Sequence, residues 1–186
     1  CSQKGLSCPP GLGPFTIGQR AEEKLNKRKS KVPNWYLDVS LLNKYWGSDR
    51  VYHHTAPVNM NFGIREALRL LSEEGLDQSW IRHRNNAEKL WEGLESLGLE
   101  LHVPTELRLP TLTTVKIPEG IDGKSFTSHL LKNYGIEIGG GLGDLAGKVW
   151  RIGLMGFNST PENVDKLLKI FDSDLPKFKN NEVASA

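Results

Sequence analysis

The chain has 186 residues, a length that allows a sizeable core in one domain or two small ones. Its 24 Lys and Arg residues nearly balance 22 Asp and Glu residues, so the net charge of +2 provides no broad electrostatic field for nucleic acid or an anionic membrane. The longest apolar runs fall far short of a membrane span. Nucleic-acid and membrane partners are therefore not expected.

Cys1 and Cys8 are the only cysteines of the sequence. Their spacing matches neither a disulfide framework nor a zinc or iron–sulfur motif, so we expect no metal site. A reducing, intracellular compartment fits this cysteine usage best. We expect a cytoplasmic protein, with a peroxisome or another organelle left open for a eukaryotic source.

The first 60 residues contain a predicted strand, a charged helix and an aromatic segment. The apolar run 15–17 predicts the strand, and residues 20–31 have the charge pattern of a helix with a solvated basic face rather than a binding patch. Residues 35–50 are rich in Trp, Tyr and Leu, which is typical of a buried packing surface or a subunit contact. We assign this segment to packing.

Two helices are predicted next. Apolar residues spaced three and four apart follow Asn61, and Gly75 is a good stop for this helix. A second helix is expected over residues 76–97, with Gly98 as its stop.

After residue 98 the pattern changes to short strands that alternate with helices. Helices are predicted over 123–134 and 160–171, the second opened by Ser159 or Thr160. Strands are predicted over 99–103, 112–117, 136–138 and 149–154. Helices against one face of a small, mainly antiparallel sheet make an α+β unit.

The segment 141–146, Gly-Leu-Gly-Asp-Leu-Ala, matches the dinucleotide fingerprint G-x-G-x-x-[GA]. That fingerprint requires a helix to open at its third small residue, yet Gly147 and Lys148 lead into a predicted strand. We therefore interpret these glycines as a flexible loop over an active-site mouth.

Two basic residues are candidates for chemistry, although an ordinary solvated lysine explains Lys4 better when its neighbours alone are considered. Lys4 lies between Ser2-Gln3 and Gly5, and a lysine amine can condense with a carbonyl group when its environment favours the uncharged form. Arg151 lies in an apolar run, where a cation is costly to bury unless it is paired. Its guanidinium suits a bidentate carboxylate ligand, and an internal salt bridge explains it equally well.

The segment 52–55, Tyr-His-His-Thr, brings hydroxyl and imidazole groups together. Adjacent histidines on a strand point to opposite faces, so a shared metal site is not expected, and His53 and His54 are assigned to packing or to the support of neighbouring site residues. The hydroxyls of Tyr52 and Thr55 can both donate to a phosphate if the segment turns.

Five blocks of the sequence form one pattern: Ser2-Gln3-Lys4, Tyr52-His53-His54-Thr55, Arg108 to Thr114, Gly139 to Gly156, and Asn158-Ser159-Thr160. Together they resemble the class V aminotransferases, specifically the alanine–glyoxylate and serine–pyruvate aminotransferase group, in register over about residues 1–172. The resemblance implies a fold-type-I transferase dependent on pyridoxal phosphate (PLP), with an α/β fold and an α+β small domain. It also implies that this chain is the C-terminal part of such a protein and begins just before the Schiff-base lysine.

The resemblance also implies a division of the chain. Residues 1–74 would be a remnant of the large PLP-binding domain, residues 75–175 the small α+β domain, and residues 176–186 a flexible tail. The family's pyridine-binding aspartate, stacking aromatic ring and phosphate loop all precede the lysine. We therefore expect this chain alone to be inactive.

Residue roles follow from the same resemblance. Lys4 would form the Schiff base with PLP, Gln3 would lie near its phosphate, and Arg151 would bind the substrate α-carboxylate. Tyr52 and Thr55 would bind the cofactor phosphate of the neighbouring subunit in a homodimer. The implied reaction moves an amino group from alanine, or serine, to glyoxylate and gives pyruvate, or hydroxypyruvate, and glycine.

Two other functions remain open. Some relatives of this group carry a soluble-hydrogenase-subunit label, although two cysteines without a C-x-x-C pair do not supply the usual ligands of a nickel–iron or iron–sulfur centre, so an accessory role would be needed. A non-catalytic dimerisation module is the second alternative.

Overall fold

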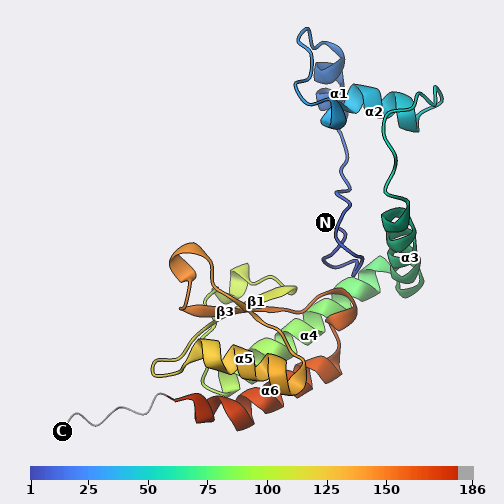
Figure 1. Cartoon of the computed structure of the whole chain (residues 1–186). Helices are drawn as coiled ribbons and strands as arrows, with labels where there is room; N and C mark the ends of the chain where they lie inside the picture. Colours follow the sequence, from blue (N-terminus) through green and yellow to red (C-terminus); the bar gives the residue numbers. More distant parts are fainter. Residues whose placement is uncertain (180–186) are drawn as a thin grey trace.

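A three-stranded antiparallel sheet packs against three helices in the C-terminal half of the computed structural model, which describes residues 1–179 (Figure 1). The strand order is β1-β3-β2, so β3 lies in the middle. The strands are β1 (Leu112–Lys116), β2 (Gly139–Gly140) and β3 (Val149–Gly153). The helices are α4 (Leu76–Ser96), α5 (Gly123–Tyr134) and α6 (Pro161–Asp174).

The hydrophobic core lies between the sheet and these helices. Trp150 and Ile152 of β3 are buried in it, whereas Arg151 between them is only half-buried, because successive strand residues point to opposite faces. Trp150 lies against Phe126 of α5 and Phe171 of α6, with ring centroids 5.4 and 5.8 Å away. One face of the sheet is thus covered, and Arg151 belongs to the other.

A buried carboxylate joins α5 to the end of α6. Asp174, 4% exposed, accepts hydrogen bonds from Lys177 Nζ at 2.6 Å, Tyr134 OH at 2.6 Å and His129 Nε2 at 2.7 Å. The Lys177 ammonium and the other donors hold the pKa of Asp174 well below its usual range, and the carboxylate raises the pKa values of Lys177 and Tyr134. The cluster thereby fixes the C-terminal turn η5 (Leu175–Phe178) against α5.

The N-terminal half is extended. Helices α1 (Gln19–Asn26) and α2 (Val39–Trp46) lie in an arm, residues 14–56, that projects away from the sheet and is joined to it by two extended stretches (Figure 1). Helix α3 (Val58–Glu74) leads back and meets α4 at Gly75, whose φ of 86° suits glycine. The remaining 3₁₀ turns are η1 (Trp35–Leu37), η2 (Thr105–Leu107), η3 (Gly143–Leu145) and η4 (Gly156–Asn158).

The helix predictions after residue 60 are confirmed by α3, α4, α5 and α6. The basic helix predicted over 20–31 is shorter, because it ends at Asn26. Residues 176–178, predicted as tail, belong to η5, and residues 180–186 lie outside the described part of the chain. The expected domain boundary near residue 74 stays a prediction.

Three predicted strands are wrong. Residues 15–17 form no strand, and 99–103 contribute a single bridge, Leu101 to Val115. Helix α5 ends at Gly135, a left-handed cap, and residues 136–138 follow it without pairing to a strand. Pairing with β3 starts at Gly139. These segments carry the right apolar residues but lack a continuous strand partner.

The aromatic segment 35–50 is more exposed than predicted. Trp35 stacks on His53 with ring centroids 4.0 Å apart, yet its exposed fraction is 53%, and that of Trp46 is 62%. The assignment to a buried packing surface is therefore wrong for these rings within this chain, and the subunit contact stays a prediction. Within residues 1–179, no helix combines the length and the apolar composition that crossing a bilayer requires.

Candidate functional site

Lys4 lies at the surface in a tight turn, residues 1–8, which we call the lysine turn. Ser2 is fully buried and its hydroxyl donates to Pro9 O at 3.0 Å, while Cys8 N donates to Ser2 O at 3.0 Å. Ser7 N donates to Lys4 O at 2.9 Å and closes the turn. The Lys4 side chain has no hydrogen-bond or ion-pair partner among residues 1–179, so its amine is available for chemistry.

An open groove of about 740 Å³ borders the lysine turn. Its lining includes the end of α3, the first turns of α4, and Pro110 and Thr111. The lining residues besides these are Cys1, Lys4, Gly5, Leu6, Leu71, Leu76, Ser79, Trp80, His83 and Arg84. A flat ligand held by Lys4 would have space on this side of the turn.

Arg151 occupies the centre of the uncovered sheet face. It pairs with Thr114 of β1 on one side and Gly139 of β2 on the other. Arg151 Nε donates to Gly140 O at 2.6 Å, and the guanidinium lies over Gly139, where an added Cβ would be 3.4 Å from Nη2. No acidic side chain within residues 1–179 forms an ion pair with Arg151.

This environment separates the two interpretations that the sequence left open. The internal salt bridge finds no partner in the described part of the chain. The terminal nitrogens of the guanidinium remain free to donate two parallel hydrogen bonds to a carboxylate.

Tyr52 and Thr55 do come together, because the segment turns. Tyr52 OH lies 3.1 Å from Thr55 Oγ1, and Tyr52 is 71% exposed. The segment lies at the end of the arm, between α2 and α3, away from the lysine turn of the same chain (Figure 1). The two hydroxyls therefore form a small polar cluster that faces outward.

The remaining predicted residues divide into local and packing roles. Gln3 is exposed beside Lys4. His53 is buried under Trp35, and its Nε2 lies 3.1 Å from Trp35 O, as expected of a packing residue. The expectation that His53 and His54 point to opposite faces is wrong, because their Nδ1 atoms lie 2.8 Å apart. No group of three or more His, Cys, Asp or Glu side chains in the described range could hold a metal ion.

The glycine run does not open a helix. A single 3₁₀ turn, η3, follows Gly141, and the chain then enters β3. An added Cβ at Gly141 would lie 1.9 Å from Leu145 O, so glycine is required for a tight turn there. The geometry needed for a dinucleotide pyrophosphate is thus missing from this turn.

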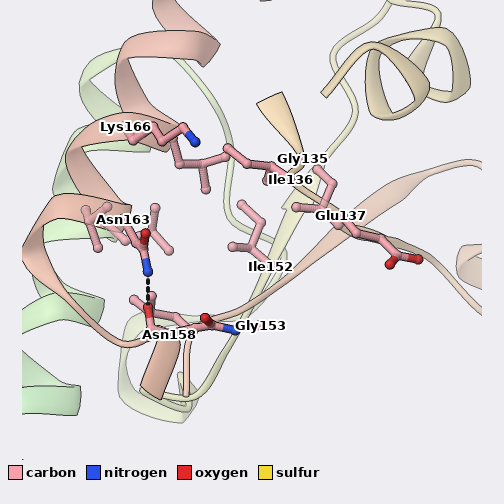
Figure 2. A pocket seen from close by; sticks show the side chains of 13 residues that line it. Gly135, Ile136, Glu137, Ile152, Gly153, Asn158, Asn163 and Lys166 are labelled. Carbon is pink, nitrogen blue, oxygen red and sulfur yellow. Dashed lines mark hydrogen bonds between the residues drawn. The ribbon is translucent and has the colours of Figure 1, made fainter. Parts of the chain in front are cut away.

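A second cavity, of about 250 Å³, opens between α6 and the end of β3 (Figure 2). Asn163 Nδ2 donates to Asn158 O at 3.0 Å across one side of it, and Glu137 and Lys166 lie at its rim (Figure 2). None of the predicted site residues lines this cavity.

Sequence reasoning missed three polar side chains that bond to a loop in contact with the lysine turn. They lie on α4, where Arg82, His83 and Asn86 all bond to the loop 155–159, which we call the Gly156 loop. His83 and Asn86 share the buried face of α4 with Leu90 and Leu94. Buried polar residues on an apolar helix face need partners, and that pattern could have identified them.

A model of the family described as aminotransferase class-V matches residues 1–167. An alanine–glyoxylate aminotransferase of Callithrix jacchus is 50% identical over 168 residues, covering 88% of this chain and 41% of the relative. A (S)-ureidoglycine–glyoxylate transaminase of Bacillus subtilis is 38% identical over 181 residues, covering 88% of this chain and 44% of the relative.

Solved structures agree with these relatives. The crystal structure of an alanine–glyoxylate aminotransferase from Nostoc sp. matches with a TM-score of 0.89 and 62% identity, covering 92% of this chain and 46% of that one. The ureidoglycine–glyoxylate aminotransferase of Bacillus subtilis matches with a TM-score of 0.91 and 39% identity, covering 95% and 46%. The chain thus spans less than half the length of these relatives.

Proposed function

Because the chain belongs to the class-V aminotransferase family, we propose that it is part of a PLP-dependent enzyme that moves an amino group from alanine, or serine, to glyoxylate. The products are pyruvate, or hydroxypyruvate, and glycine. The observation that carries the proposal is Arg151, a half-buried strand arginine whose fork has no acidic partner among residues 1–179. It offers an amino acid or a 2-oxo acid the carboxylate contact that both require.

Glyoxylate as the acceptor is favoured by the names of the relatives. The Callithrix jacchus enzyme is named for alanine and the Bacillus subtilis enzyme for ureidoglycine, whereas glyoxylate is common to both. Neither relative lends support to a hydrogenase subunit or to a non-catalytic dimerisation module.

The residues present fit PLP. Lys4 has an exposed amine beside an open groove, and Gln3, Tyr52 and Thr55 supply neutral donors suited to a phosphate. Bound PLP supplies the electron sink that makes the substrate α-proton removable. Lys4 Nζ would hold the cofactor, and as a free amine it would accept the proton from the substrate Cα. Arg151 would bind the substrate carboxylate.

The whole protein here means the longer polypeptide that the family resemblance implies around this chain. Incubation of the whole protein with ¹⁵N-alanine, glyoxylate and PLP should give ¹⁵N-glycine and pyruvate in equal amounts, measured by NMR. Serine and ureidoglycine in place of alanine define the donor preference. No transfer from any of these donors, or hydrogen uptake with a partner subunit instead, would contradict the proposal.

We propose further that Tyr52 and Thr55 bind the cofactor phosphate of the partner subunit in a homodimer. Their hydroxyls are 3.1 Å apart and exposed, and they lie away from the lysine turn of their own chain. A Lys4→Ala protein mixed with a Tyr52→Phe/Thr55→Ala protein would then form heterodimers with one intact site. After random exchange of subunits, we expect recovery of roughly a quarter of the wild-type activity.

The matched control is a mixture of Lys4→Ala with Arg151→Ala. Lys4 and Arg151 serve the same subunit's site in this proposal, so this mixture should recover nothing. Equal recovery of activity in both mixtures would argue against a role of Tyr52 and Thr55 in the partner subunit's site. So would a lack of recovery in the first mixture, once mass spectrometry shows that the subunits have exchanged.

A further inference from the structure

Ser7 holds the lysine turn in a strained conformation. Its φ of 52° is left-handed, which is unfavourable for a residue other than glycine. Its hydroxyl accepts a hydrogen bond from Phe157 N at 2.8 Å, although the two residues are 150 positions apart. Ser7 lies three residues after Lys4 and bonds the Gly156 loop, which is distant in the sequence. We infer that this loop sets the position of the lysine turn.

Gly156 makes the contact between the loop and the turn close. A Cβ added at Gly156 would lie 2.0 Å from Ser7 Oγ, 2.9 Å from Gly5 O and 3.3 Å from Lys4 O. The φ of Gly156 is also left-handed, at 59°. Only glycine therefore allows the backbone of the Gly156 loop to touch the lysine turn.

Helix α4 fixes the other side of the same loop. His83 Nδ1 donates to Ser79 O at 2.6 Å, and His83 Nε2 accepts from Gly156 N at 2.8 Å, so the ring is a neutral imidazole with its proton on Nδ1. Arg82 Nη1 donates to Gly156 O at 2.9 Å and to Ser159 O at 2.7 Å.

Arg82 is itself fixed at the junction of α3 and α4. Its Nε and Nη2 donate to the two oxygens of Glu74 at 2.5 and 2.9 Å. The Arg82 guanidinium lowers the pKa of the Glu74 carboxyl, and Glu74 raises the pKa of Arg82, as expected for a bidentate pair. The Gly156 loop is thus held by the lysine turn on one side and by Arg82 and His83 of α4 on the other.

The same segment carries Arg151. Arg151 precedes Gly156 by five residues, a stretch of at most about 18 Å when extended, and β3 runs directly into the loop. We propose that Ser7, Gly156 and His83 form a latch of positioning residues that sets where Lys4 stands relative to Arg151. This inference rests on the proposed function for its effect on catalysis, whereas the latch itself is a property of the fold.

The test compares Ser7→Ala, Gly156→Ala and the double variant in the whole protein. Ser7→Ala loses one hydrogen bond and should lower kcat about threefold to tenfold, with KM for the amino donor unchanged. Gly156→Ala drives a methyl group into Ser7 Oγ and should lower kcat by at least about tenfold. Removing Oγ relieves part of this overlap, so the double variant should be at least about threefold more active than Gly156→Ala. Ser128→Ala, an exposed serine on α5, is the control.

A second measurement does not depend on activity. Hydrogen exchange of the Ser7 and Cys8 amides in the cofactor-free whole protein should be at least about fivefold faster in Ser7→Ala than in wild type and unchanged in Ser128→Ala. His83→Gln keeps an acceptor for Gly156 N and should retain kcat, whereas His83→Leu should lose at least about tenfold.

The two measurements separate the two proposals. If the wild-type protein transfers no amino group, the proposed function fails, and the exchange experiment still decides whether the latch exists. Two results would contradict the latch. In one, the kcat losses of Ser7→Ala and Gly156→Ala multiply in the double variant. In the other, amide hydrogen exchange at residues 7 and 8 is the same in Ser7→Ala as in wild type.

Discussion

Replacing Lys4 with alanine should lower kcat of the whole protein by at least about 100-fold. The variant loses the amine that holds the cofactor and the group that moves the substrate α-proton, and such proton transfer alone contributes roughly 10²–10⁴-fold. The loss is measured by steady-state kinetics with alanine and glyoxylate at saturating PLP. Circular dichroism should remain unchanged, because the Lys4 side chain has no bonded partner in residues 1–179.

Two controls make the Lys4 prediction specific. Lys4→Arg keeps the charge but cannot take either role, and it should be as inactive as Lys4→Ala. Lys132→Ala, an exposed lysine on α5, should leave kcat within about twofold of wild type. Activity of Lys4→Arg near the wild-type level would show that the charge and not the amine chemistry matters.

Arg151→Ala should reduce kcat/KM for amino acids by at least about tenfold, with PLP absorbance unchanged. Removing one partner of a charged, bidentate contact costs roughly 2–5 kcal/mol, and each 1.4 kcal/mol is one decade. Arg151→Lys keeps the charge but loses the planar guanidinium, so its kcat/KM should fall less than that of Arg151→Ala. The measurement is steady-state kinetics over a range of donor concentrations.

Lys116→Ala is the matched control for Arg151. Lys116 lies on β1, on the same uncovered sheet face, and is half-buried like Arg151, but it is paired with Glu100. Loss of such a surface ion pair costs at most about 1 kcal/mol. Loss of folding or PLP binding in Arg151→Ala, with normal turnover of the protein that survives, would show that the arginine is structural.

Elements with a strong local signal were predictable from the sequence. Helices α3 and α4 follow three-and-four apolar spacing up to Gly75 and Gly98, and Thr160 caps α6 by accepting from Asn163 N. The predicted fold class is also confirmed, because the chain matches part of solved aminotransferase structures with a TM-score of 0.89. The strand predicted over 136–138 failed because its pairing depends on where the chain meets β3, which no local pattern encodes.

The candidate site divides in the same way. Lys4, Arg151, Tyr52 and Thr55 stand in recognisable sequence blocks, whereas the hydrogen bond from Gly156 N to His83 joins residues 73 positions apart. Only the structure reveals that this loop supports the lysine turn. It also shows that Arg151 has no acidic partner within residues 1–179, a question that the sequence left open.

Borohydride reduction tests the central role of Lys4 most directly. Reducing the whole protein with bound PLP fixes the cofactor to whichever lysine holds it, and mass spectrometry of the peptides then locates the added pyridoxyl group. We expect the label on Lys4, in the peptide that begins with Cys1-Ser2-Gln3 of this chain or with residues before it. A label on any other lysine, with Lys4 unmodified, would contradict the account.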